Sequence, residues 1–387
     1  MDLRALESRF QTLETPFYYY DLDVLHETLA AVKGAIADAP YMHVHYAIKA
    51  NSNPKLLEII ANNGLGADCV SGGEISAALS AGFPASKVVF AGVGKSDKEI
   101  LNGLTSEIAC FNVESLPELM RINELAATIG KTARVAFRIN PNVDAGTHAK
   151  ITTGLNENKF GISLDDTIDA VKQARQLPNI EFCGLHFHIG SQILNFVVFE
   201  NLCKRVNDLQ DTLEKAGVFV KSINMGGGLG IDYQNPKDHP IPPFAEYFGI
   251  FKKHLCLRPE QELHFELGRS VVGQCGSLIA RTLFVKQGKT KKFVILDAGF
   301  TDLIRPAMYG AHHYTENLTA SSDSASEVYD VVGPICESSD VFSKDELLPV
   351  TRRGDLIAFR SAGAYGEVMA SSYNCRSLPN SYFSSEM

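Results

Sequence analysis

The segment HVHYAIKANSNPKLLEIIANNG, residues 43–64, shows the pattern from which the fold can be predicted. It begins with a short apolar run, residues 43–49, and continues into a stretch whose apolar residues recur every three or four positions. The first pattern predicts a β-strand and the second an amphipathic helix. We therefore expect a strand that ends at Lys49 and is followed by a helix.

Seven further apolar runs repeat this plan. They are GADCV (66–70), KVVFA (87–91), EIACF (107–111), RVAFRI (134–139), EFCGLHFH (181–188), VKSINM (220–225) and ELHFEL (262–267). Most of the gaps between them carry a helix-like stretch. Such alternation predicts parallel strands with crossover helices, in an open doubly wound sheet or a closed barrel. Eight units in roughly 240 residues suit a barrel, so we predict an α/β fold with a TIM-like (β/α)8 barrel over residues 23–267.

The pattern changes beyond about residue 267. Strand-like runs now follow one another without regular helices between them: GSLIARTLFVKQ, KKFVILDAG, SEVYDVVG and GDLIAFRSAG. These runs predict a second, C-terminal domain over residues 268–387, an antiparallel β-sandwich or barrel. The N-terminal segment 1–22 contains the strand-like FYYYDL and is expected to join this domain.

Composition excludes several classes of protein. Of the 387 residues 45% are hydrophobic, and 36 Lys and Arg against 45 Asp and Glu give a net charge of −9 without like-charge blocks. We therefore expect a globular protein with no nucleic-acid partner. The chain has no long apolar run and no secretory signal pattern, and its eight cysteines form no CxxC pair. This predicts a cytoplasmic protein without membrane contact, a metal site or disulfides.

Polar residues at the carboxyl ends of the predicted barrel strands are the first candidates for function, because barrel active sites lie there. They are Lys49, Asp68, His188, Gly226, Gly227, Gly228, Glu266 and Arg269. Lys49 either reaches solvent or, in a buried setting, forms a Schiff base with a carbonyl group. The three glycines form either a tight turn or a phosphate-binding loop, and the nearby Arg269 favours the second interpretation.

Glu266 either pairs with Arg269 or serves as the acidic partner of a pyridine nitrogen. His188 is either a core histidine or a ring that stacks on a cofactor, and Ser191, three residues further on, could donate to phosphate. A lysine that binds carbonyl groups, a phosphate site and a carboxylate together suggest pyridoxal 5'-phosphate.

At these residues the sequence resembles the fold-type III pyridoxal-phosphate decarboxylases, and within them the branch that acts on diaminopimelate. The resemblance extends along nearly the whole chain through the motifs TPFYYYDLD, YAIKANSNP, SGGE, NPNVDAGTH, NKFGI, GLHFHIGSQI, GGGLGIDY, ELGRS, LIRPAMYGAHH, GPICESSD and GAYGEVM. So many ordered motifs make the signal specific.

The resemblance implies a role for each cofactor-binding candidate. Lys49 would bind the cofactor covalently, His188 would stack on its ring, and Glu266 would pair with the ring nitrogen. The remaining cofactor-binding residues by resemblance are Asp68, Ser191, Gly226, Gly227, Gly228, Arg269 and Tyr365. Arg269 and Tyr365 are also expected to meet the substrate, and sequence alone does not choose between the two roles of Arg269.

The second domain is expected to complete the site. By resemblance, Cys336 is the acid that returns a proton to the α-carbon after carbon dioxide leaves, and it reaches the site of the neighbouring subunit in a homodimer. Diaminopimelate carries a second ammonium and a second carboxylate. Glu337 can meet the ammonium, and Arg305, helped by Tyr309, can bind the carboxylate.

The resemblance thus implies pyridoxal-phosphate-dependent decarboxylation of meso-diaminopimelate to L-lysine, the last step of lysine biosynthesis. Related decarboxylases acting on ornithine, arginine or carboxynorspermidine remain alternatives, although Arg305 would lack its carboxylate there. An alanine-racemase-like enzyme would need a base, usually a tyrosine, where GPICESSD offers a thiol. A catalytically silent regulatory homologue would typically lose Lys49 or Cys336, and both are present.

Overall fold

The chain folds into two compact units in a computed structural model that describes residues 2–143, 159–321 and 324–387. The barrel unit comprises Leu29–Gly230 and Pro243–Gly268, and the β unit comprises Met1–Thr28, Ile231–Pro242 and Arg269–Met387. Residues 23–28 and 231–242, within the range predicted for the barrel, cluster with the β unit. The motif NPNVDAGTH, residues 140–148, and the first residue of NKFGI lie partly or wholly outside the described residues.

Eight parallel strands close into the predicted barrel, in chain order from β2 to β9. They are β2 (Met42–Ala47), β3 (Gly66–Cys69), β4 (Val88–Phe90), β5 (Cys110–Val113), β6 (Ala133–Arg138), β7 (Ile180–His186), β8 (Ser222–Asn224) and β9 (Glu262–Leu267). Each predicted run overlaps one strand. Strand β5 begins later than the predicted run 107–111, because Glu107 adopts a positive φ of 55° and the Ile108 N–H still donates to Gly103 of the preceding helix.

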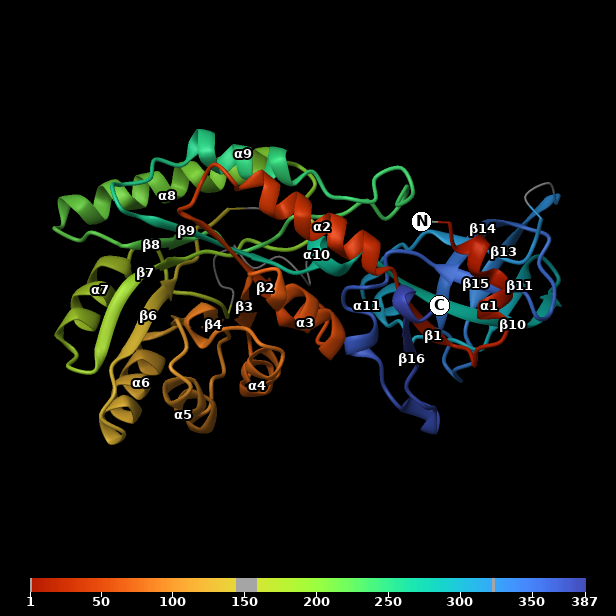
Figure 1. The fold of residues 1–387 in the computed structure, drawn as a ribbon, viewed down its shortest axis with the longest axis horizontal. Coiled ribbons are helices and arrows are strands. Elements are labelled where there is room, and N and C mark those ends of the chain that lie inside the picture. The colour runs from red at the N-terminus through yellow and green to blue at the C-terminus, as the bar shows by residue number, and fades with distance from the viewer. Residues whose placement is uncertain (1, 144–158, 322–323) are drawn as a thin grey trace. The chain divides into compact units, whose positions relative to one another are not determined.

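The helices lie outside the ring formed by the barrel strands (Figure 1), and all but α2 follow one of these strands in the chain. They are α2 (Leu22–Ala35), α3 (Pro54–Asn62), α4 (Gly72–Ser80), α5 (Asp97–Thr105), α6 (Leu116–Thr128), α7 (Thr167–Gln176), α8 (Val197–Lys215) and α9 (Phe244–His254). Three begin at a serine, Ser71, Ser96 or Ser115, whose hydroxyl accepts a hydrogen bond from the backbone N–H three residues later. Such caps satisfy N–H groups that the first helical turn leaves without partners.

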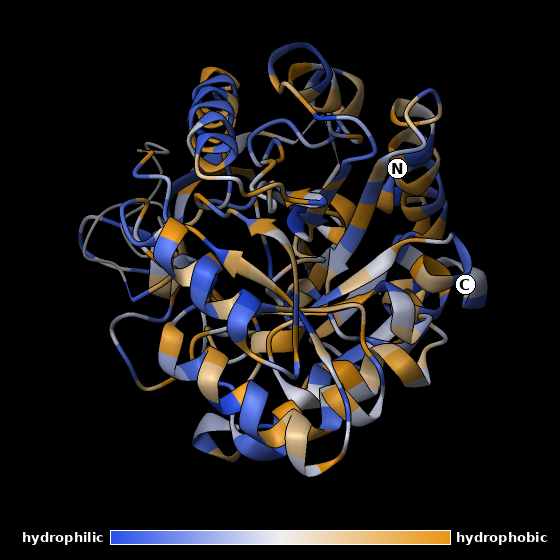
Figure 2. Ribbon diagram, turned by 90° about the vertical axis from the view of Figure 1, so that its left-hand side faces the viewer, coloured by the Kyte–Doolittle hydropathy of each residue, from blue (hydrophilic) through white to orange (hydrophobic). Residues whose placement is uncertain are grey.

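The helices carry hydrophobic and hydrophilic residues in alternating patches along their length (Figure 2). On β9, the ring of Phe265 packs outward, with centroids 4.9 Å from those of Phe248 and Phe251 on α9. Because successive side chains of a strand point to opposite faces, His264 and Glu266 point into the barrel. Polar side chains therefore reach the barrel interior from β9.

A mostly antiparallel sheet forms the β unit, in the order β12-β15-β10-β11-β13-β14. Its strands are β10 (Gly276–Gln287), β11 (Lys292–Leu296), β12 (Thr315–Asn317), β13 (Ser326–Val332), β14 (Val341–Pro349) and β15 (Leu356–Phe359). The N-terminal strand β1 (Phe17–Tyr20) pairs antiparallel with β10 and parallel with β16 (Asn380–Phe383). Strands β11 and β13 are also parallel. The short helices are α1 (Glu7–Phe10), α10 (Arg269–Val272) and α11 (Arg305–Tyr309), with 3-10 turns at Leu3–Leu6, Ile48–Ala50, Ala85–Lys87, Glu367–Met369, Tyr373–Cys375 and Ser384–Glu386.

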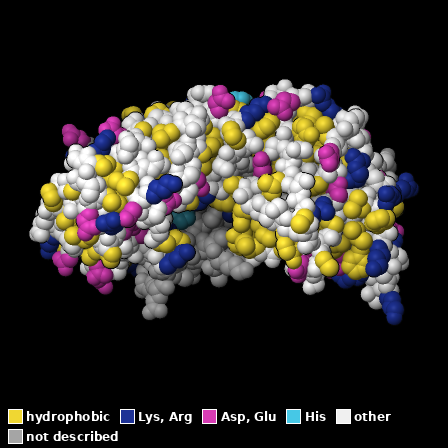
Figure 3. Space-filling model, turned by 90° about the horizontal axis from the view of Figure 1, so that it is seen from below, with side chains coloured by type: hydrophobic (Ala, Val, Ile, Leu, Met, Phe, Trp, Pro, Cys, Tyr) yellow, Lys and Arg dark blue, Asp and Glu magenta, His cyan; other side chains and the backbone are white. Residues whose placement is uncertain are grey.

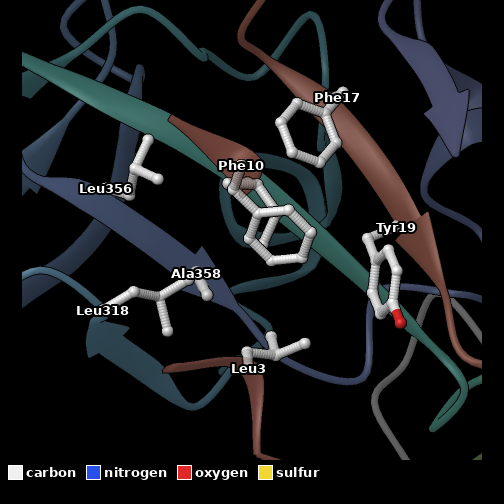
Figure 4. Packing of buried hydrophobic residues seen from close by; sticks show 8 residues of the cluster. Leu3, Phe10, Phe17, Tyr19, Leu318, Leu356 and Ala358 are labelled. Atoms are coloured by element: carbon white, nitrogen blue, oxygen red, sulfur yellow. The ribbon is translucent and has the colours of Figure 1, made fainter. Parts of the chain in front are cut away.

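The N-terminal segment contributes to the core of the β unit. Phe10 and Phe17 pack edge to face, with ring centroids 5.4 Å apart, and Leu318, Leu356 and neighbouring side chains surround them (Figure 4). All of these side chains are buried. Removal of several aromatic side chains from water is a large stabilising contribution, so the segment before β1 is part of this unit.

Charged side chains of both signs are interspersed over the face shown in Figure 3. None of the helices that the structure describes combines the length and the apolar character needed to cross a bilayer.

Candidate active site

Lys49 lies in the single 3-10 turn that follows β2 rather than in the strand itself. Its Nζ is 3.2 Å from Oδ2 of Asp68, which is buried in β3. Oδ1 of Asp68 is buried and has no hydrogen-bond partner among the described residues. The predicted lysine and the predicted aspartate are therefore brought together at the carboxyl ends of neighbouring strands.

Glu266 projects into the barrel and accepts hydrogen bonds from three other strands. Asn112 Nδ2 on β5 and Asn224 Nδ2 on β8 donate to Oε1, at 3.1 and 2.8 Å. His186 Nε2 on β7 lies 2.9 Å from Oε2. A carboxylate can only accept, so Nε2 of His186 carries the proton in this contact.

The surroundings of Glu266 favour its ionised form. Burial by itself would raise the pKa of Glu266, but His186, followed by Lys49, lowers it well below its ordinary value. For Asp68 the balance is opposite, because burial and then the charge of Glu266 raise its pKa to about 7, against the lowering effect of Lys49. The barrel thus holds one firmly ionised carboxylate and one that titrates near neutrality.

His188 follows β7 and contacts the glycine loop that follows β8. The N–H of Gly227 donates to His188 Nδ1 at 3.3 Å. Burial, with the nearby charges of Arg138 and Lys49, holds the pKa of His188 well below its ordinary value, so its ring is neutral. Ser191 lies in the same segment, three residues further on, and is half-buried.

The three glycines are required by close backbone packing. A Cβ on Gly226 would lie 2.2 Å from the carbonyl oxygen of Phe187, and one on Gly227 would lie 2.0 Å from that of Glu266. Gly226 and Gly228 also have φ values of +68° and +112°, which disfavour other residues. The loop therefore lies directly on the ends of β7 and β9.

A second group of predicted residues meets within the β unit. Arg269, which begins α10, donates from Nη1 to the hydroxyl of Tyr233 at 2.7 Å. Its guanidinium lies over the ring of Tyr365, 4.9 Å from the centroid. Arg305 in α11 lies over the ring of Tyr233, with its guanidinium carbon 4.7 Å from the ring centroid. Tyr309 ends α11 and is half-buried.

Cys336 and Glu337 lie in an exposed loop of the β unit. The carboxylate of Asp340 organises this loop by accepting the N–H of Ile335 at 2.7 Å, and Glu337 accepts a hydrogen bond from the hydroxyl of Tyr373 at 3.0 Å. The thiol of Cys336 is thus accessible on its own unit.

Sequence reasoning missed five residues that contact the predicted ones. They are Asn112, His186, Asn224, Tyr233 and His313. The first three lie on the same inward face as Glu266, and a strict count of alternate residues along the strands could have identified His186, two residues before His188. Nothing in the sequence indicated that Tyr233 and His313 meet the two arginines.

A cavity of about 1060 Å³ lies at the opposite, amino-terminal ends of the barrel strands, where His43, Arg134 and Glu262 are among the lining residues. Lys49, Asp68 and Glu266 do not line it. Because chemistry in this fold takes place at the carboxyl ends of the strands, we do not assign the active site to this cavity.

The chain is similar to known proteins over nearly its whole length. Residues 23–273 match the family model described as pyridoxal-dependent decarboxylase, pyridoxal binding domain. A diaminopimelate decarboxylase of Bacteroides thetaiotaomicron is 62% identical over 98% of each chain, and one of Neisseria meningitidis serogroup B is 44% identical over 94% of this chain and 86% of its own. The crystal structure of diaminopimelate decarboxylase from Helicobacter pylori complexed with L-lysine is 39% identical, with a TM-score of 0.92, over 98% of this chain and 94% of its own.

Proposed function

The chain belongs to the diaminopimelate decarboxylases, within the pyridoxal-dependent decarboxylases, and we propose that Lys49, Glu266 and Cys336 carry the chemistry of its reaction. The enzyme decarboxylates meso-diaminopimelate to L-lysine and carbon dioxide with pyridoxal 5'-phosphate as cofactor. The observation that carries the proposal is that one barrel contains both a lysine amine after β2, Lys49, and a carboxylate, Glu266, that three N–H donors hold ionised.

The residues of the barrel fit this cofactor. A carboxylate offers about four acceptor positions, and Asn112, Asn224 and His186 occupy three of them on Glu266. The remaining position can accept the N–H of a protonated pyridine ring. When bound, pyridoxal phosphate accepts the electron pair of the bond to the departing carboxylate.

The other barrel residues would hold and orient the cofactor. Lys49 would attach it through the ε-amine, and the neutral ring of His188 would stack on its face. Asp68, with a pKa raised to about 7 by burial and by Glu266, can exchange a proton with the lysine amine beside it. The loop Gly226–Gly228 and Ser191 would bind the phosphate, because small residues let backbone N–H groups approach an anion.

Substrate recognition is assigned to the β unit. Arg305 would bind the distal carboxylate, with Tyr309 as a further donor, and Glu337 would meet the distal ammonium. Arg269 and Tyr365 would contact the phosphate or the reacting end of the substrate. A guanidinium presents two parallel N–H donors to a carboxylate, so an arginine suits this role better than a lysine.

The final proton would come from Cys336. The bond from the α-carbon to the departing carboxylate must be replaced by a bond to hydrogen, so a proton has to reach that carbon before the product can leave. We assign this proton to Sγ of Cys336, which is exposed on its own unit. General acids of this kind contribute about 10²–10⁴ in rate.

We also propose that the enzyme is a cytoplasmic homodimer with shared active sites, in which Cys336 serves the neighbouring subunit. The exposed position of Cys336 and Glu337 supports the sharing. The eight cysteines are free thiols, the state that reducing compartments maintain. No nucleic acid or membrane partner is proposed.

One experiment tests the function directly. The purified enzyme supplied with pyridoxal phosphate should show a visible absorption band, and addition of meso-diaminopimelate should release L-lysine and carbon dioxide in equal amounts. L-ornithine and L-arginine serve as controls and should give no comparable turnover. Turnover of either control at the rate of diaminopimelate would contradict the substrate assignment.

A further inference from the structure

One tyrosine of the β unit contacts two buried arginines. The hydroxyl of Tyr233 accepts a hydrogen bond from Arg269 Nη1 at 2.7 Å, and the face of the same ring lies 4.7 Å from the guanidinium carbon of Arg305. Each arginine is only 6% exposed. Tyr233 thus bridges two side chains that the proposed function assigns to anion binding.

A histidine holds Arg305 from another direction. His313 Nε2 lies 2.8 Å from Arg305 Nη1, and His313 Nδ1 lies 2.9 Å from the backbone oxygen of Arg360. Because a guanidinium only donates and a carbonyl only accepts, Nε2 accepts and Nδ1 carries the proton. Burial and then the charge of Arg305 lower the pKa of His313 to about 3, so the ring stays neutral and keeps its acceptor.

The neutrality of these two partners matters for an arginine that must bind an anion. Burial and the neighbouring Arg269 lower the pKa of Arg305, yet an arginine remains protonated in proteins. An acidic partner would compete with a substrate carboxylate for the guanidinium. A histidine acceptor and an aromatic face fix its orientation while its charge remains available.

We propose that His313 and Tyr233 are positioning residues that orient the guanidinium of Arg305 toward the distal carboxylate of the substrate, and so determine selectivity for ligands that carry this carboxylate. This inference rests on the proposed function, which assigns that carboxylate to Arg305. Decarboxylation removes one of the two carboxylates of diaminopimelate, so the product L-lysine retains the distal one. L-lysine is therefore a ligand that reports on Arg305 without the decarboxylation step.

The test uses holoenzyme and a matched pair of substitutions at position 313. His313→Leu removes the acceptor, whereas His313→Gln can place an amide oxygen near the position of Nε2. Loss of a hydrogen bond to a charged group corresponds to roughly a tenfold to hundredfold change in affinity. We expect His313→Leu to raise the KM for meso-diaminopimelate and the inhibition constant of L-lysine by that factor, with kcat within about threefold, and His313→Gln to restore most of the loss.

Two controls separate positioning from a general structural effect. The inhibition constant of 1,5-diaminopentane, which lacks both carboxylates, should be unchanged in His313→Leu. Replacement of the adjacent His312 by leucine should leave the selectivity unchanged, because His312 forms no hydrogen bond to Arg305 among the described contacts.

A second matched pair tests Tyr233. Tyr233→Phe keeps the ring under Arg305 and should retain selectivity for L-lysine over 1,5-diaminopentane, whereas Tyr233→Leu should reduce it.

Equal weakening of L-lysine and 1,5-diaminopentane in His313→Leu would overturn the inference, as would unchanged binding of both. If His313→Leu did not fold, failure of folded His313→Gln to retain selectivity for L-lysine would overturn it equally. The proposed function has a separate outcome, because absence of lysine release by the wild-type enzyme would refute it whatever the ligand selectivity.

Discussion

Replacement of Asn112 by leucine tests whether the donors around Glu266 stabilise a charged carboxylate. Asn112 donates to Oε1 of Glu266 at 3.1 Å, and both side chains are buried. A hydrogen bond to a charged group contributes about 1.5–3 kcal/mol, whereas one between neutral groups contributes about 0.5–1.5 kcal/mol. Leucine has a similar volume, so we expect the free energy of unfolding to fall by about 2 kcal/mol, chiefly through the lost donor.

The charge dependence follows from a second substitution. In a Glu266→Gln background the acceptor is neutral, and the same Asn112→Leu change should cost only about 1 kcal/mol. The difference, about 1 kcal/mol, is the coupling between Asn112 and the charge of Glu266. Loss of the donor should also raise the pKa of Glu266, because the donor stabilises the ionised carboxylate more than the neutral one.

Urea unfolding of the four apoenzymes at pH 7.5, followed by far-ultraviolet circular dichroism, measures these values. The long helices belong largely to the barrel unit, so the signal reports on the unit that contains both residues. An equal loss in the two backgrounds would refute the reasoning, because it would show that Asn112 does not interact with a charged group.

Three further predictions concern the lysine, the thiol and the buried histidines. Lys49→Ala should abolish the visible absorption band of the bound cofactor and the release of lysine, as measured by absorption spectra and product assays. Its circular dichroism spectrum should stay unchanged, which would show that the variant is folded. Cys336→Ala should keep the band and lose about 10²–10⁴ in kcat; unchanged turnover would exclude the thiol as the proton donor. Burial lowers the pKa of His45 to about 4 and those of His264 and His313 to about 3. Their contribution to stability is therefore complete above pH 6.5 and is lost as pH falls toward these values, because the unfolded chain binds protons first. His313→Gln should reduce the loss of stability between pH 6.5 and 5.5 by about 1 kcal/mol, as measured by urea unfolding at both pH values; an unchanged loss would show that this histidine is protonated in the folded state.

The barrel could be predicted from the sequence because its signals are local. Each strand and helix shows its own period, and the order of the runs alone predicts a parallel arrangement. Lys49, His188 and Glu266 could be named as candidates for the same reason, since each follows or ends an apolar run. The family motifs extended this to Arg305 and Cys336, which no periodicity marks.

The donors to Glu266 could not be predicted in this way. The fourth run suggested a strand over residues 107–111, whereas β5 extends from Cys110 to Val113, so Asn112 lies within the strand and not beyond it. Its role depends on barrel closure, which brings β5, β7 and β8 within hydrogen-bond distance of a side chain on β9.

By itself, the sequence of this protein determined the kinds of elements, their order and the candidate residues for the chemistry, because these depend on neighbours along the chain. Only the tertiary structure decided which side chains determine the properties of those residues. Asn112 and Glu266 are 154 positions apart, and Tyr233 and Arg269 are 36 apart. The charge state of a carboxylate and the orientation of a guanidinium depend on burial and on the few groups within about 4 Å, and such groups come together only when distant segments pack.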